Sequence, residues 1–183
     1  MGDQLLIRLC SPTFAGLKTG NLFSVDIKDR EKFNAEVREF NRRFACKGIR
    51  MIPVKYSKKH VLIYVYRPKM LKRDFTNEEV CRVLKEKGYS YSNADRCVAQ
   101  LVKHLEQDSD FPHEIGLFLG YPVDDVLGFM RSSREGVKYT GVWKVYSNKD
   151  AALETFDRYK RCTEIYKKAH NNGVSLDELT VVC

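Results

Sequence analysis

Two neighbouring apolar segments constrain what this chain can fold into more than any other feature. The stretches "IRMIPVKY" and "VLIYVYRP" flank the short polar stretch "SKKH", a pattern typical of an antiparallel β-hairpin. The second segment is apolar at every position from Val61 to Tyr66. A strand without a polar face is buried on both sides, so we predict that it lies in the centre of a small sheet.

Further strands and helices are expected around the hairpin. Short apolar runs predict strands at Leu5–Cys10 and in "VWKVY". Periodic apolar positions and capping residues predict about six helices, beginning near "REKF", "TNEE", "SNAD", "PHEI", "PVDD" and "SNKD", with a last turn at "SLDE". Because strands and helices are largely segregated, we predict a single α+β domain over residues 1–183, with a small, mainly antiparallel sheet of about four strands. A Rossmann-type fold is disfavoured, because G-x-G-x-x-G is absent.

The composition is that of a folded protein, since 43% of the 183 residues are hydrophobic and 31% are charged. No apolar run reaches the roughly 18 residues that a membrane helix needs. The first ten residues lack the basic start and apolar stretch of a signal peptide, so we expect a cytoplasmic protein. Its six cysteines are then expected to be reduced. The net charge of +8 suits nucleic acid, an acidic partner or a phosphorylated ligand.

The stretch "FPHEIGLFLGYPVDDVLGFM" has the spacing of a helix-turn-helix, with Gly120 at the turn. Its second helix, however, would present Asp124 and Asp125 to the phosphates of DNA, which repel carboxylates. We therefore interpret the stretch as a helical corner, with Pro122 in the first turn of the second helix and the two acids stabilised by the helix dipole.

The loop "SPTFAGLKTGNLF" is the principal candidate for a binding site. Glycines allow backbone N–H groups to turn toward an anion, and a Lys with neighbouring hydroxyls can hold a phosphate. The candidate ligand-binding residues of this loop are Ser11, Thr13, Gly16, Lys18, Thr19 and Gly20. We expect Lys18 to point toward a cleft also lined by "FPHE" or "VWKVY". The alternative is a surface turn that covers the sheet edge.

Three residues are weak candidates for catalysis. Cys10 would act as a nucleophile if a base such as His113 lay beside it, because a thiol needs a nearby base or cation to form the thiolate. The alternative is a buried, inert thiol. Glu114 follows His113, and both also suit the start of a helix, where the dipole favours a carboxylate.

The segment "GVWKVY" contains the chain's single Trp, Trp143. In a strand, Trp143 shares one face with Val145, and Lys144 and Tyr146 share the other. Trp143, Lys144 and Tyr146 are therefore candidates for a stacking surface that binds a base or a flavin ring. Core packing of Trp143 is the alternative.

The motifs "CSPTFAGLKTGNLFS", "FPHEIGLFLGYPVDDVLGF", "GVWKVY" and "YKRCTEIY" occur in this order and spacing. Together with the hairpin segments, they resemble the domain of unknown function 3793 family, which is found in anaerobic bacteria. The resemblance implies a bacterial protein and no established activity. Many members carry His-Cys where this chain has Leu9-Cys10, and three cysteines where it has Val137, Tyr139 and Val142. A cysteine-based metal site is therefore not expected here.

Three classes of function remain open. We favour a small-molecule-binding or enzymatic domain for an anionic, phosphate-bearing ligand of nucleotide or flavin type, with its cofactor unknown. A module that binds RNA or other nucleic acid through its basic surface is the second class. A non-catalytic protein-interaction domain is the third. The sequence does not indicate the oligomeric state, and no membrane contact is expected.

Overall fold

The computed structural model of the chain describes residues 2–107 and 110–182. The helices are α1 (Asp3–Phe14), α2 (Arg30–Phe44), α3 (Pro68–Asp74), α4 (Glu78–Glu86), α5 (Ala94–Gln107), α6 (Ile115–Phe118), α7 (Val123–Arg131), α8 (Lys149–Asn171) and α9 (Leu176–Leu179), with a 3-10 helix, η1, at Ala45–Lys47. The strands are β1 (Gly20–Asp26), β2 (Arg50–Tyr56), β3 (His60–Tyr66), β4 (Tyr139–Thr140) and β5 (Lys144–Val145). The predicted α+β fold is confirmed, although its elements are more numerous than expected.

The larger sheet has the strand order β1-β3-β2, and both pairings are antiparallel. The predicted hairpin and its central strand are therefore confirmed. The register of β2 against β3 shifts between Pro53 and Lys55. A proline lacks the N–H that a ladder requires, and such a bulge tolerates it. The smaller sheet is the short pair β4 and β5.

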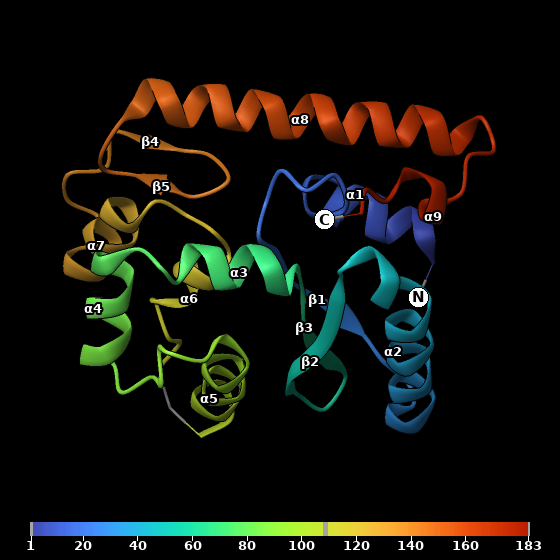
Figure 1. Cartoon of the computed structure of the whole chain (residues 1–183), viewed down its shortest axis with the longest axis horizontal. Coiled ribbons are helices and arrows are strands. Elements are labelled where there is room, and N and C mark those ends of the chain that lie inside the picture. Colours follow the sequence, from blue (N-terminus) through green and yellow to red (C-terminus); the bar gives the residue numbers. More distant parts are fainter. Residues whose placement is uncertain (1, 108–109, 183) are drawn as a thin grey trace.

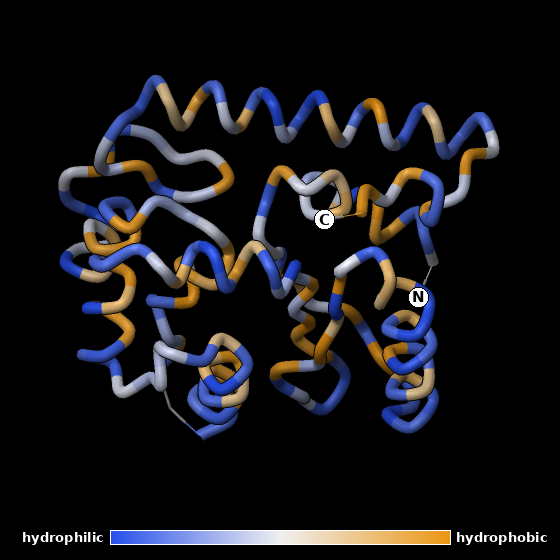
Figure 2. The backbone as a smooth tube through the Cα atoms, viewed as in Figure 1, coloured by the Kyte–Doolittle hydropathy of each residue, from blue (hydrophilic) through white to orange (hydrophobic). Residues whose placement is uncertain are grey.

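Alternate side chains of β3 enter two different hydrophobic cores, because successive residues of a strand point to opposite faces. Val61, Ile63 and Val65 pack with residues of α1, α2 and α8. Tyr64 and Tyr66 pack with residues of α3 to α7. Figure 1 shows α8 extending across the top of both halves, and Figure 2 shows hydrophobic residues gathered along the central strands. The apolar strand thus separates and supports the two halves of the domain.

The predicted strand at Leu5–Cys10 is wrong, because these residues belong to α1. Leu6, Ile7, Cys10 and Phe14 recur at helical spacing and are all buried, and α1 packs against α8. A short apolar run fits a buried helix as well as a strand. The strand that pairs with β3 opposite β2 is instead β1, which lies in a stretch that we expected to be a loop.

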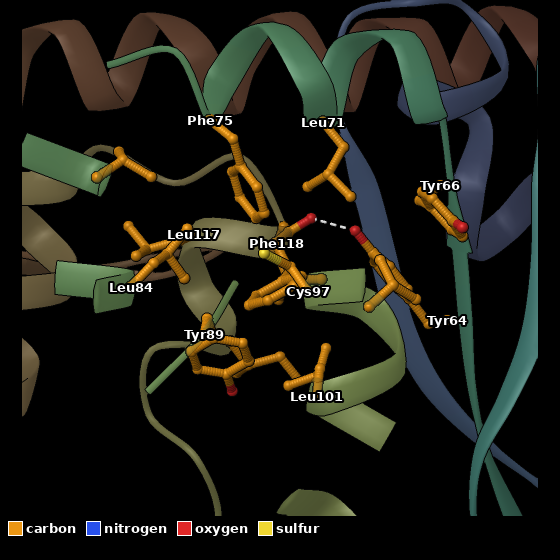
Figure 3. Packing of buried hydrophobic residues seen from close by; sticks show 14 of the residues in the cluster. Tyr64, Tyr66, Leu71, Phe75, Leu84, Tyr89, Cys97, Leu101, Leu117 and Phe118 are labelled. Atoms are coloured by element: carbon orange, nitrogen blue, oxygen red, sulfur yellow. Dashed lines mark hydrogen bonds between the residues drawn. The ribbon is translucent and has the colours of Figure 1, made fainter. Parts of the chain in front are cut away.

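The helical corner between α6 and α7 turns at Gly120, whose φ is +75°. A Cβ at this position would lie 2.7 Å from the Thr19 hydroxyl oxygen, so the corner approaches the loop after α1 closely. The buried Tyr64 hydroxyl donates a hydrogen bond to the carbonyl of Phe118 in the same corner (Figure 3). The corner is therefore tied both to the central strand and to the loop that carries Lys18.

Arg67 follows β3 directly and is fully buried, at 0% exposure. Its guanidinium donates hydrogen bonds to the carbonyls of Thr13 (2.6 Å), Phe14 (2.7 Å), Lys47 (3.0 Å) and Val181 (2.7 Å). The first two carbonyls end α1, where the helix dipole favours a cation. One side chain thus joins the sheet to α1, to η1 and to the segment that follows α9.

We expect Arg67→Met to lower the free energy of unfolding by more than about 3 kcal/mol, because it leaves several buried carbonyls without donors. Urea unfolding followed by far-UV circular dichroism measures this change. Arg42 is the control, since its side chain is 76% exposed and pairs with Glu39 one turn away on α2. Arg42→Met should change stability by less than about 0.5 kcal/mol. Similar losses in both variants would contradict the assigned role of Arg67.

Candidate functional site

Lys18 stands in the loop between α1 and β1, and its side chain turns inward. Gly16, with a φ of +71°, lets the chain reverse after α1. The amides of Leu17 and Lys18 then donate to the carbonyl of Pro12, at 2.8 and 3.1 Å. The Lys18 side chain is only 4% exposed, and its Nζ lies 5.2 Å from the centre of the Tyr121 ring. A short, closed loop therefore holds a cation inside the protein.

The Lys18 ammonium is enclosed without an anionic partner. Within residues 2–107 and 110–182, neither a hydrogen bond nor an ion pair reaches Nζ. Burial lowers the pKa of Lys18 from 10.5 to about 8, against a smaller raising effect of Cys10. The face of the Tyr121 ring supplies a cation–π contact, which compensates part of the lost hydration. Lys18 is consequently a cation at neutral pH that its protein environment stabilises only weakly.

A cleft of about 540 Å³ opens around this side chain and is called the Lys18 cleft. It is lined by side chains of the loop, of α3 and α8, of the segment before α4, and of the helical corner. Its polar lining consists of Lys18, Thr19, Arg73, Asp74, Thr76, Asn77, Tyr121 and Tyr159. Lys18 also lines a pocket of about 440 Å³ that includes Val142 of the "VWKVY" segment.

The start of α7 contributes to the Lys18 cleft, because Gly120, Pro122 and Val123 line it. Pro122 is the N-cap residue of this nine-residue helix, and no described side chain caps it. The first amides of an uncapped helix attract anions. Asp74 supplies the carboxylate in the lining of the Lys18 cleft. This carboxylate already accepts a hydrogen bond from the Thr19 hydroxyl and forms an ion pair with Arg73 at 2.9 Å.

Other candidates from the same loop have structural roles. The Ser11 hydroxyl donates to a carbonyl one turn earlier in α1, and the Thr13 hydroxyl donates to the side chain of Asn21 at 2.7 Å. Gly20 lies in β1, where a Cβ would come within 2.6 Å of the Tyr64 ring. These residues therefore shape the loop, whereas Lys18 and Thr19 line the cleft.

Cys10 and His113 lie in different surroundings. Cys10 is 0% exposed in the core beneath α1, and burial raises the pKa of its thiol to about 12 despite the opposing effect of Lys18. It is therefore a protonated thiol at neutral pH, which is a poor nucleophile. His113 is exposed and contacts the Phe129 ring edge-on, with 4.9 Å between ring centres.

A further pocket, of about 290 Å³, lies beside the helical corner and is called the aromatic pocket. It is lined by Phe111, His113, Ile115, Gly116, Tyr121, Asp125, Val126, Phe129, Trp143 and Lys144. Tyr121 and Trp143 lie 4.9 Å apart, ring centre to ring centre, with an angle of 31° between their planes. Tyr121 therefore belongs to both this pocket and the Lys18 cleft. Of the predicted site residues, Lys18 and Thr19 line the Lys18 cleft, whereas His113, Trp143 and Lys144 line the aromatic pocket.

Asp125 holds the short β5 segment against α7, a role that the sequence did not indicate. It is 2% exposed, and its carboxylate accepts from Trp143 Nε1 (2.7 Å) and from the amides of Tyr146 and Ser147 (both 2.8 Å). Burial by itself would raise the pKa of Asp125, but these hydrogen bonds lower it on balance. Two adjacent acids at a helix start gave no signal that one of them turns inward.

The remaining candidates are engaged with the protein. Glu114 is buried and accepts a hydrogen bond from the Tyr89 hydroxyl at 2.9 Å, so its side chain does not cap α6. Lys144 Nζ donates to the carbonyl of Ser133 at 2.7 Å and lies 5.5 Å from the centre of the Phe129 ring. The Tyr146 hydroxyl donates to a carbonyl at the end of α7.

Cysteines and acids do not assemble into a metal site in the described part of the chain, which contains no group of three or more His, Cys, Asp or Glu able to hold an ion. The five described cysteines are unpaired, and the sixth, Cys183, lies outside the described residues. No helix among the described residues has the length and apolar character to span a bilayer.

The chain folds as an α+β domain in which the Lys18 cleft and the aromatic pocket flank the helical corner. The chain belongs to the family described as "Protein of unknown function (DUF3793)", which it matches over residues 6–180. This membership confirms the resemblance that the motifs indicated. No curated protein and no solved structure matches the chain significantly.

We expect Asp125→Asn to lower the free energy of unfolding by about 1.5–3 kcal/mol. The NH₂ group of the new amide would face an N–H group that now donates a hydrogen bond to the carboxylate. The difference from wild type should be largest above about pH 4 and shrink at lower pH, since a lowered pKa stabilises the fold only while the group is ionised. Urea unfolding at pH 3 to 7 measures it. Asp124→Asn, at the exposed neighbouring position, is the matched control.

We expect Lys18→Met to be more stable than wild type at pH 7, because it removes a poorly solvated cation. Between pH 8 and 10.5, Lys18 loses its proton in the folded protein but keeps it in the unfolded chain. The free energy of unfolding of the wild type therefore rises with pH relative to that of the variant. The difference in stability between variant and wild type should narrow across this range. Urea unfolding at four pH values tests this, with the exposed Lys103→Met as control. A stability difference that widens with pH would contradict the interpretation that the protein stabilises the Lys18 ammonium only weakly.

Proposed function

We propose that this protein binds an anionic small molecule and that the phosphate or a similar group of this ligand lies in the Lys18 cleft. The observation that carries the proposal is the Lys18 ammonium, 4% exposed and facing the cleft without an anionic partner among the described residues. A buried cation is costly unless it is paired. An anion would pair with it at short range in an environment of low polarity.

Two further features of the Lys18 cleft support an anionic ligand. The uncapped amides at the start of α7 begin with the amide of Val123, a residue that lines the cleft. Arg73 adds a second cation at the rim, with its side chain 68% exposed. Asp74 opposes an anion, but Thr19 and Arg73 already engage its carboxylate. Asp124 is exposed, and Asp125 is directed toward Trp143.

We propose binding alone for this protein and assign no reaction to it. The Cys10 thiol is protonated at neutral pH, and it lies in the core rather than in the lining of either pocket. A nucleophile beside a base is the usual mark of covalent catalysis. The contacts of the Lys18 cleft instead match a site that recognises charge.

Isothermal titration with sulfate tests the proposal, because sulfate resembles phosphate and does not titrate near neutral pH. We expect Lys18→Met to weaken sulfate binding by about 1–3 kcal/mol, the range for a charge-assisted hydrogen bond. Because the lowered pKa of Lys18, about 8, lies near this pH, sulfate binding at pH 8 should take up protons and its enthalpy should depend on the buffer. Proton uptake should disappear in Lys18→Met.

Two further variants separate local contacts from general charge. Lys103→Met removes an exposed Lys of α5 and should leave sulfate affinity unchanged. Val123→Pro removes one amide hydrogen at the first position of α7, where proline fits a helix, and should weaken sulfate binding severalfold. If Lys18→Met and Lys103→Met reduced the affinity for sulfate equally, sulfate binding would depend only on the net charge of the protein, and the proposal would be wrong.

A further inference from the structure

The aromatic pocket has the walls of a binding site for a flat ring. Its rings come from three segments of the chain: Phe111 and His113 before α6, Tyr121 and Phe129 around α7, and Trp143 before β5. Phe111 is 46% exposed and Trp143 is 9% exposed, so the pocket has an open end and a closed end. Its volume of about 290 Å³ suits a group of one or two fused rings.

The carboxylate and the ammonium that line this pocket, those of Asp125 and Lys144, are already engaged within the protein, which favours an uncharged occupant. The Asp125 carboxylate accepts three hydrogen bonds from Trp143, Tyr146 and Ser147. Lys144 donates to the carbonyl of Ser133. What the pocket offers a ligand is therefore mainly the faces and edges of aromatic rings, which bind other flat rings by stacking. A phosphate would find no free donor at the closed end.

The aromatic pocket and the Lys18 cleft share one wall, the ring of Tyr121. Lys18 Nζ lies 5.2 Å from the centre of this ring, and the centre of the Trp143 ring lies 4.9 Å from it. The ammonium and the indole are therefore no more than about 10 Å apart. A single small molecule can cover this distance.

We propose that the ligand of the Lys18 cleft also carries a flat, uncharged group of one or two rings, and that this group occupies the aromatic pocket. This inference rests on the proposed function, because it assumes an anionic group at Lys18. The ligand class is then a ring joined to a phosphate by a short linker, as in a nucleoside monophosphate. The ring supplies stacking contacts and the phosphate supplies the ionic ones, so each half strengthens the binding of the other.

Trp143 provides a specific readout, because it is the only Trp of the chain and its indole N–H gives one side-chain signal in a nitrogen-15 correlation spectrum. Adenosine monophosphate, adenosine and sulfate are the probes. We expect adenosine monophosphate to shift the Trp143 signal and to bind at least about tenfold more tightly than adenosine or sulfate. In Lys18→Met, its affinity should fall to that of adenosine.

Phe129→Leu removes one ring of the aromatic pocket and keeps an apolar side chain. It should weaken the binding of adenosine monophosphate at least about fivefold and leave the affinity for sulfate unchanged. Phe23→Leu, at a partly buried position that packs on the other core, is the matched control and should change neither. An unmoved Trp143 signal at saturating adenosine monophosphate, or equal affinities for adenosine and its monophosphate, would overturn the inference.

The sulfate titration keeps the two proposals apart. If sulfate binding depends on Lys18 while adenosine monophosphate leaves Trp143 unaffected, the ring inference fails and the proposed function stands. If sulfate binding is insensitive to Lys18→Met, the proposed function fails and this inference fails with it.

Discussion

The buried guanidinium of Arg67 is the contact on which the rest of the molecule depends. It binds the last carbonyls of α1, while its own backbone amide donates to the carbonyl of Thr19 at 2.9 Å. The loop that carries Lys18 is therefore fixed at both ends by one residue at the end of the central strand. Four hydrogen bonds to carbonyls allow a charged side chain to be fully buried. This arrangement fixes the loop, and the contacts of Lys18 with Pro12 and Tyr121 then set its position within the loop.

The helical corner between α6 and α7 links the two pockets in a similar way. Its turn packs against Thr19, Tyr121 separates the Lys18 cleft from the aromatic pocket, and Asp125 holds Trp143 in place. The corner has the spacing of a helix-turn-helix, but α7 begins with one exposed acid, Asp124, and one buried acid, Asp125. One inward carboxylate and one uncapped helix start give this segment a structural role and a candidate binding role together.

The sequence predicted the parts of the structure that depend on local patterns. The hairpin and the central strand followed from apolar residues at every position between Val61 and Tyr66. The run at Leu5–Cys10 was misassigned because a short apolar run fits a helix or a strand, and its main packing partner, α8, lies far along the chain. Lys18 was singled out as a loop cation, but its burial was not foreseeable. The inward turn of Asp125 depends on Trp143, Tyr146 and Ser147, which no local pattern connects to it.

The packing of α1 against α8 has a consequence for the order in which the chain can fold during synthesis. α1 is complete at residue 14, yet its partner helix is not complete until residue 171 has left the ribosome. The amide of Val181 then donates to the carbonyl of Phe14, which closes the same region last. Contacts so distant along the chain form slowly. Until then the side of α1 that contacts α8 stays uncovered, and exposed apolar surface of this kind makes a folding intermediate prone to aggregation.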